Sequence, residues 1–111
     1  MSSGFIESGL SAAAAEVHRA LASLQEELEA IDFYHQRWDV AEDESLRAVL
    51  AHNRDDEMEH AAMLLEWLRR ALPALDGQLR KFLFTQGGIE GADGGETPVA
   101  DGRGLGLGKL V

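Results

Sequence analysis

The sequence predicts an all-α protein: two long antiparallel helices and a short C-terminal helix, with the long helices of two chains packing as a four-helix bundle. Three observations indicate this class. Residues 10–86 contain only Gly77, whereas nine of the 12 glycines follow residue 86. Apolar side chains recur at alternating steps of three and four in two long segments, which is the spacing of helices that pack against helices. Pro73 ends the second segment, since proline cannot continue a helix.

The first helix is expected from about Ser11 to Trp38. Ser11 can cap the free amides, and the alanines at 12–15 favour helix formation. Its apolar stripe comprises Val17, Leu21, Leu24, Leu28, Ile31, His35 and Trp38. At about 1.5 Å per residue such a helix is roughly 40 Å long. That length is too great for a compact three-helix monomer, so it favours pairing with another chain.

The second helix is expected after a turn at residues 39–43, with Asp43 or Ser45 as its cap, and it should run to about Ala71. Its stripe comprises Leu46, Leu50, Asn53, Glu57, His60, Leu64, Trp67 and Ala71. The ends of this stripe are apolar and its centre is polar. A short third helix, from about Ala74 to Phe84, is expected to cover one end of the bundle.

Composition excludes several classes of protein. With 111 residues and 45% hydrophobic content, the chain suffices for one small domain. The net charge of -10 argues against a nucleic-acid partner and favours cations. Because there is no cysteine, any metal must be held by oxygen and nitrogen. Residues 1–10 show no secretory signal and no segment is long and apolar enough to span a membrane, so we expect a soluble cytoplasmic protein.

The polar centre of the second helix indicates a metal site. Glu57 and His60 are three residues apart, so they project from one helix face. Glu27 shares the packing face of the first helix with Leu24 and Ile31. An antiparallel pair joined near residue 41 brings Glu27 close to Glu57. Two carboxylates and an imidazole suit a divalent ion such as Fe²⁺, Mn²⁺ or Zn²⁺.

A carboxylate-bridged di-iron site needs twice this set: a Glu from each of two helices and Glu-x-x-His from each of two more. One chain supplies half of this ligand set. We therefore expect the site to form between two subunits and the isolated monomer to be unable to form it. Tyr34 lies about two turns beyond Glu27 on the same face. It could hydrogen-bond a ligand or take part in electron transfer.

Two alternatives remain open on pattern alone. Asn53, Glu57 and His60 could instead form a buried hydrogen-bonded layer that sets register and oligomeric state. Glu26 and Glu29, which flank Glu27, are either part of a solvated acidic face or an entrance site that draws cations toward the centre.

The sequence resembles the encapsulated ferritins over most of residues 16–86. The likeness is carried by residues 26–34 (EELEAIDFY), 52–63 (HNRDDEMEHAAM), 66–70 (EWLRR) and 82–85 (FLFT). It implies a half-ferritin whose two-helix chains pair around a ferroxidase centre and assemble into a decameric ring. One departure is Phe33, where many relatives are expected to have tryptophan.

The resemblance also implies roles for single residues. Glu27, Glu57 and His60 match the family's iron ligands, and Tyr34 matches the tyrosine beside them. Glu26 and Glu29 match its entrance carboxylates, so the resemblance implies an entrance site rather than a solvated acidic face.

The C-terminal part is expected to direct the protein to a partner. Residues 1–86 form the helical domain, residues 87–100 a flexible acidic Gly-rich linker, and residues 101–111 (DGRGLGLGKLV) a peptide with spaced leucines suited to a groove. This peptide resembles those that load cargo into encapsulin shells. The alternative is a tail that binds nothing.

Together these features predict a ferroxidase that oxidises Fe²⁺ at a di-iron centre between subunits and feeds iron to an encapsulin nanocompartment. The alternative is a non-catalytic helical assembly protein whose polar layer sets dimer pairing.

Overall fold

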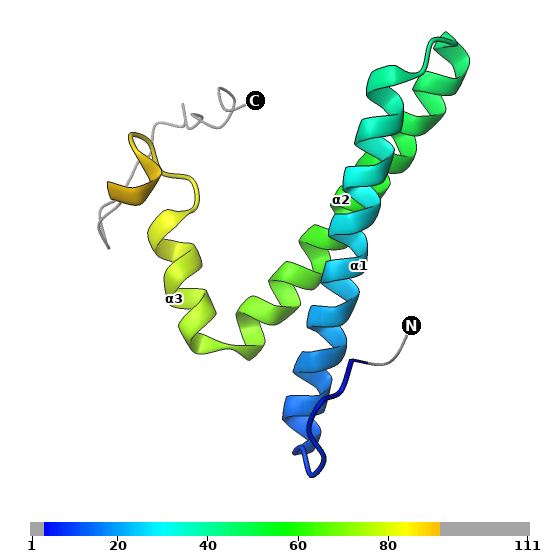
Figure 1. Ribbon diagram of the computed structural model, residues 1–111. Helices are drawn as coiled ribbons and strands as arrows, with labels where there is room; N and C mark the ends of the chain where they lie inside the picture. The colour runs from blue at the N-terminus through cyan, green and yellow to red at the C-terminus, as the bar shows by residue number, and fades with distance from the viewer. Residues whose placement is uncertain (1–3, 92–111) are drawn as a thin grey trace. The chain divides into compact units, whose positions relative to one another are not determined.

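The computed structural model describes residues 4–91 and is helical, with no strand in that range. In chain order the elements are α1 (Ala12–Val40), α2 (Glu44–Ala71), α3 (Pro73–Phe82) and a 3₁₀ turn, η1 (Ile89–Gly91) (Figure 1). The chain divides into two compact units between Ala71 and Leu72. The all-α prediction is confirmed, whereas the four-helix bundle of two chains stays a prediction. Within residues 4–91 no helix has the length and apolarity needed to cross a membrane.

The start of α1 is set by its capping residue. Ser11 has an extended backbone, and its Oγ accepts a hydrogen bond of 3.0 Å from the amide of Ala14, so one of the free N-terminal amides is satisfied. The helix ends at Val40, two residues later than expected, and the amide of Ala41 closes it with a 3.0 Å bond to the carbonyl of Arg37.

The connection between α1 and α2 is residues 41–43, and it resolves the choice of cap. The carboxylate of Asp43 accepts a 2.8 Å hydrogen bond from the amide of Leu46. Asp43, and not Ser45, is therefore the capping residue. At the other end α2 stops at Ala71, as expected, and Pro73 is the first residue of α3, where its missing amide costs nothing.

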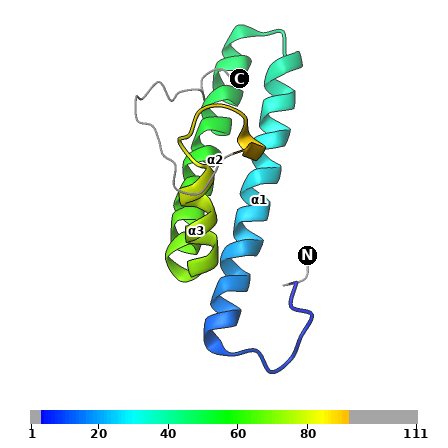
Figure 2. The same ribbon diagram turned by 90° about the vertical axis from the view of Figure 1, so that its left-hand side faces the viewer.

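Helices α1 and α2 form an antiparallel hairpin and lie side by side in both ribbon views (Figures 1 and 2). Its core is small: among the described residues only Ala20, Ala61 and Leu68 are buried. Large apolar side chains that are at least two-fifths exposed line both long helices: Leu21, Leu28, Phe33, Val40, Leu46, Val49, Met58, Met63 and Trp67. A hairpin with so little buried surface and so much exposed apolar surface is typical of a chain that packs against another.

The segment before α1 turns back along the first turns of that helix. The ring of Phe5 lies 4.1 Å from the ring of His18, measured between centroids, and the guanidinium of Arg19 lies 5.8 Å from the Phe5 centroid. Gly4 comes so close to His18 that an added Cβ would lie 3.0 Å from the imidazole. This segment therefore forms one wall of two hollows beside α1, both of which are lined by Gly4 and His18.

The second unit contains α3 and η1. Helix α3 ends at Phe82, two residues before the predicted end at Phe84, because Leu83 already has an extended backbone (φ -77°, ψ 146°), and Phe84 follows with a φ of 60°. The hydroxyl of Thr85 donates a 2.9 Å hydrogen bond to the carbonyl of Phe82 and satisfies this helix end. The side chain of Phe84 is 81% exposed.

Candidate metal centre

Three side chains from the two long helices converge in the middle of the hairpin. Glu27 comes from α1, whereas Glu57 and His60 come from one face of α2 because they are three residues apart. One ligand atom from each of the three lies within 4.8 Å of the others. The Nδ1 atom of His60 lies 3.3 Å from Oε1 of Glu57 and 3.5 Å from Oε1 of Glu27. The structure thus brings together the three residues that the sequence placed on facing helices.

One oxygen of the Glu27 carboxylate has no hydrogen-bond partner. Its Oε1 atom is buried and accepts no hydrogen bond. The side chains of Glu27 and Glu57 are only 25% and 24% exposed, whereas His60 is 48% exposed. A buried charged oxygen without a partner is unfavourable. A cation among the three groups would remove that penalty, and the oxygen and nitrogen donors fit a divalent metal.

The pKa values of the three groups describe how the cluster holds protons without a metal. The pKa of Glu27 lies above its usual value, chiefly because Glu57 shares a hydrogen bond with the protonated Glu27 carboxyl, with burial adding to the shift. The same hydrogen bond is the main cause that lowers the pKa of Glu57. The pKa of His60 is raised, first by its hydrogen bond to Glu57, although burial opposes this shift. Both raised pKa values favour the retention of a proton within the cluster.

Tyr34 and Phe33 lie outside the ligand cluster. Tyr34 is half-buried, and its ring centroid lies 5.6 Å from the guanidinium carbon of Arg37. The same guanidinium lies 5.7 Å from the centroid of Phe33, whose side chain is 43% exposed. Arg37 thus contacts the faces of both aromatic rings.

Glu26 and Glu29 are exposed and also lie outside the ligand cluster. They line a hollow of about 630 Å³ beside α1, and Gly4, His18 and Gln25 complete its polar lining. The two carboxylates therefore lie on one concave surface, one and two residues from the candidate ligand Glu27.

The sequence pattern placed Trp38 on the apolar stripe and indicated no role for Arg47 or Arg54. In the structure both guanidinium groups lie against the Trp38 ring, at 4.7 and 5.0 Å from its centroid. The spacing of seven between the arginines places both on one side of α2, but it does not indicate which side chain of α1 they contact.

Comparison with known proteins identifies the family. The EncFtn-like family model matches residues 5–86. The chain is 53% identical over 97 residues to a "Ferritin-like protein" of Thermotoga maritima, covering 83% of this chain and 82% of that protein. It is 50% identical over 107 residues to an "Encapsulated ferritin-like protein" of Rhodospirillum rubrum, covering 84% of this chain and 76% of that protein.

A solved structure agrees with the fold. The crystal structure of protein ne0167 from Nitrosomonas europaea superposes with a TM-score of 0.75 at 53% sequence identity, covering 78% of this chain and 97% of that chain. The family match spans both long helices and the three converging side chains. The chain therefore belongs to the EncFtn-like family, and an iron-related, ferritin-like function follows from that membership.

Proposed function

We propose that this protein is a ferroxidase that oxidises Fe²⁺ to Fe³⁺ at a di-iron centre formed between two copies of the chain. The observation that carries the proposal is the convergence of Glu27, Glu57 and His60 around a buried carboxylate oxygen that accepts no hydrogen bond. Fe²⁺ is the substrate, and these donors suit it.

The ligand count favours a shared site. Helix bundles hold two iron ions with a Glu from each of two helices and Glu-x-x-His from each of two others, and one hairpin supplies half of this set. His60 is 48% exposed, and Trp67, seven residues later on the same helix face, is 43% exposed. A second copy packed on this face would cover both and supply the missing ligands.

In the proposed dimer the two Glu57 carboxylates bridge the ions, and Glu27 and His60 of each chain are terminal ligands. Each Fe²⁺ loses one electron, and dioxygen or a peroxide is the acceptor. Tyr34 is assigned a place beside the centre, where its phenol can hydrogen-bond a ligand or pass an electron. The protein holds the ions in a fixed geometry and leaves coordination positions open.

The test is the rate of Fe²⁺ oxidation by wild type, Glu57→Ala and Glu59→Ala. Glu59 is an exposed carboxylate two residues away, so its removal changes charge without changing the ligand set. Glu57→Ala should oxidise Fe²⁺ no faster than buffer, whereas Glu59→Ala should match wild type. Wild-type rates in Glu57→Ala would overturn the proposal. If wild type itself gave only the buffer rate, and Glu57→Ala failed to dimerise, the non-catalytic assembly role would stand instead.

We also assign Glu26 and Glu29 to an entrance site. Their position on the hollow beside α1, next to the ligand Glu27, supports this role. A double variant, Glu26→Gln with Glu29→Gln, should slow the uptake of Fe²⁺ in stopped-flow measurements and leave its equilibrium affinity for the centre unchanged. Unchanged uptake would assign both carboxylates to the solvated surface.

The proposed partner is an encapsulin shell, and the proposed location is a nanocompartment in the cytoplasm. The relative from Rhodospirillum rubrum carries the word "encapsulated" in its name. We divide the chain into a half-ferritin domain (1–86), a linker (87–100) and a targeting peptide (101–111). Residues 92–111, with the whole peptide, lie outside the described residues. Deleting residues 101–111 should abolish co-purification with a shell protein and leave Fe²⁺ oxidation intact, and continued co-purification would refute the assignment.

The proposed assembly is a decameric ring of such dimers. A ring of short bundles has no closed cavity, so bulk iron would be stored by the surrounding shell. Sedimentation of the metal-loaded protein measures the number of chains directly.

A further inference from the structure

The buried side chains of the hairpin lie to one side of the metal ligands. They are Ala20, Ala61 and Leu68. All three are on the side of the open end, because Ala20 precedes the α1 ligand and the other two follow the α2 ligands. Residues 28–56, which run from the ligands through the connection and back, are all described and include no buried side chain. Half-buried apolar side chains such as Ile31 and Leu50 pack there, and polar and aromatic contacts add to them.

Those contacts centre on Trp38, near the end of α1. The guanidinium carbons of Arg47 and Arg54, both on α2, lie 4.7 and 5.0 Å from the centroid of its ring. Cations at this distance from an indole face are attracted to it. Arg47 also donates from Nε to the main-chain carbonyl of Trp38 at 3.1 Å. The imidazole of His35 stacks on the same indole at 5.5 Å.

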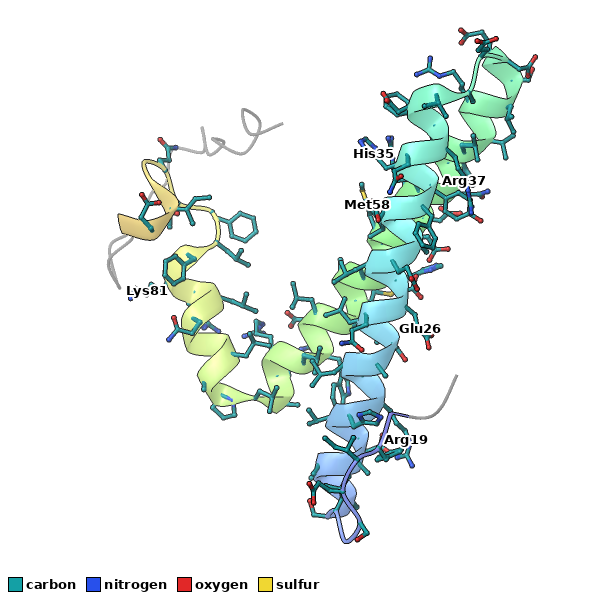
Figure 3. The ribbon with its side chains drawn as sticks, in the orientation of Figure 1. Arg19, Glu26, His35, Arg37, Met58 and Lys81 are labelled. Carbon is teal, nitrogen blue, oxygen red and sulfur yellow. The ribbon has the colours of Figure 1, made fainter. Side chains whose placement is uncertain are left out.

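Arg54 extends these contacts toward the proposed metal ligands. It lies three residues, about one turn, before Glu57 on α2. Its side chain is only 17% exposed, and its Nη1 lies 3.1 Å from Nδ1 of His35 on α1. His35 projects from the same side of the hairpin as Met58, and Glu26 and Arg37 project from the other side (Figure 3). Glu26 therefore lies on the opposite side of the hairpin from His35.

We propose that Trp38 is a positioning residue, which sets the spacing of α1 and α2 beside Glu57 through Arg47, Arg54 and His35; these four residues are called the latch. The inference rests on the proposed function and deepens it. Without the indole, both arginines lose their cation–π contact with α1. The hydrogen bonds of Arg47 to the Trp38 carbonyl and of Arg54 to His35 then remain as their contacts with α1, so α2 is less firmly held near Glu57. Metal ligands must be held to within a fraction of an ångström, and groups behind them supply that precision.

The test is anaerobic calorimetry with Fe²⁺ on full-length protein. Trp38→Leu should weaken Fe²⁺ binding by about tenfold, the scale on which groups behind metal ligands act. Trp38→Phe retains an aromatic face and should stay within about twofold of wild type. Leu68→Val, in the core beyond the ligands, is the matched control. It should lower the thermal midpoint while leaving Fe²⁺ affinity unchanged.

The outcomes separate the latch from the metal centre. Loss of Fe²⁺ binding in Glu57→Ala, with wild-type affinity in a folded Trp38→Leu, would overturn the latch and leave the centre intact. Wild-type affinity in Glu57→Ala would overturn the centre itself. An equal loss of Fe²⁺ affinity in Leu68→Val would show that any destabilisation of the hairpin weakens binding, and it would also refute the latch. Should Trp38→Leu lack helical circular dichroism, Arg54→Gln decides the question, with the same expected loss.

Discussion

The Nδ1 atom of His60 on α2 lies 3.5 Å from Oε1 of Glu27 on α1. The two atoms are donors of a proposed metal centre, and the carboxylate oxygen accepts no hydrogen bond. In the absence of a metal the attraction between the two groups depends on a proton on the imidazole. Metal and protons should therefore compete for the same donors, which makes the centre sensitive to pH.

The direction of this sensitivity follows from the pKa shifts. Because the pKa values of His60 and Glu27 are raised, both groups keep their protons to higher pH than usual, and a metal must displace them. Fe²⁺ affinity should fall steadily from about pH 8 to about pH 6, where an imidazole gains its proton. Anaerobic calorimetry in two buffers with different heats of ionisation would measure the protons released.

The control for this measurement is His52→Ala. His52 pairs with Asp56 at 3.2 Å on the exposed side of α2 and takes no part in the cluster. Proton release should persist in this variant and be smaller in His60→Ala, which lacks the imidazole proton. Affinity that does not depend on pH would show that His60 is not a ligand.

Acid stability should depend on Glu66, near the end of α2. Its carboxylate accepts hydrogen bonds from Arg69 and Arg70 at 2.7 Å, and these bonds lower its pKa from 4.5 to about 2. A lowered carboxyl pKa stabilises the folded state above the unfolded value of 4.5, and this contribution is lost as the pH falls toward 2. Glu66→Gln should therefore reduce the dependence of the thermal midpoint on pH in this range.

The matched variant for Glu66 is Glu59→Gln, which removes an exposed carboxyl from the same helix. It should retain the acid dependence of wild type. If both variants behave alike, the arginine contacts of Glu66 contribute nothing specific to stability.

The cap of α2 makes a simpler prediction. Asp43→Ala removes the 2.8 Å hydrogen bond to the amide of Leu46 and should lower the free energy of unfolding by about 1 kcal/mol, as for other N-cap residues. Ser45→Ala tests the other residue that the sequence allowed, and it should have little effect. Urea denaturation followed by circular dichroism measures both, and the reverse order would assign the cap to Ser45.

Sequence patterns predict some of these features well because they depend on helical periodicity. The spacing of Glu57 and His60 fixes a common face, and the short connection fixes which residue of α1 lies opposite. Whether Asp43 or Ser45 caps α2 depends on local backbone angles, so the sequence left both possible. The early end of α3 depends on the extended backbone of Leu83 and the positive φ of Phe84 that follows it. Non-glycine residues seldom adopt a positive φ, and sequence patterns do not signal it.

The latch was missed for a different physical reason. Whether an arginine on one helix meets an aromatic face on another depends on the rotation of both helices about their axes and on long side-chain rotamers. Periodicity places Trp38 on the packing face and says nothing of what contacts its ring. The three candidate metal ligands, by contrast, have side chains shorter than that of arginine, which remain closer to the helix face from which they project.

The exposed apolar face of α2 leads to a prediction about assembly. If each Fe²⁺ is bound by ligands from two chains, Fe²⁺ binds the dimer and not the separate monomers, so it must shift the equilibrium toward association. Light scattering under anaerobic conditions should show a higher mass with Fe²⁺ than with a chelator.

Trp67→Glu should weaken this shift in mass, because Trp67 is 43% exposed on the face that carries His60, and a charge buried there would lack a partner. Ile6→Glu, at a position that is 89% exposed before α1, should assemble like wild type. A mass that is independent of Fe²⁺ in wild type would contradict a centre shared between chains, whatever the behaviour of the two variants.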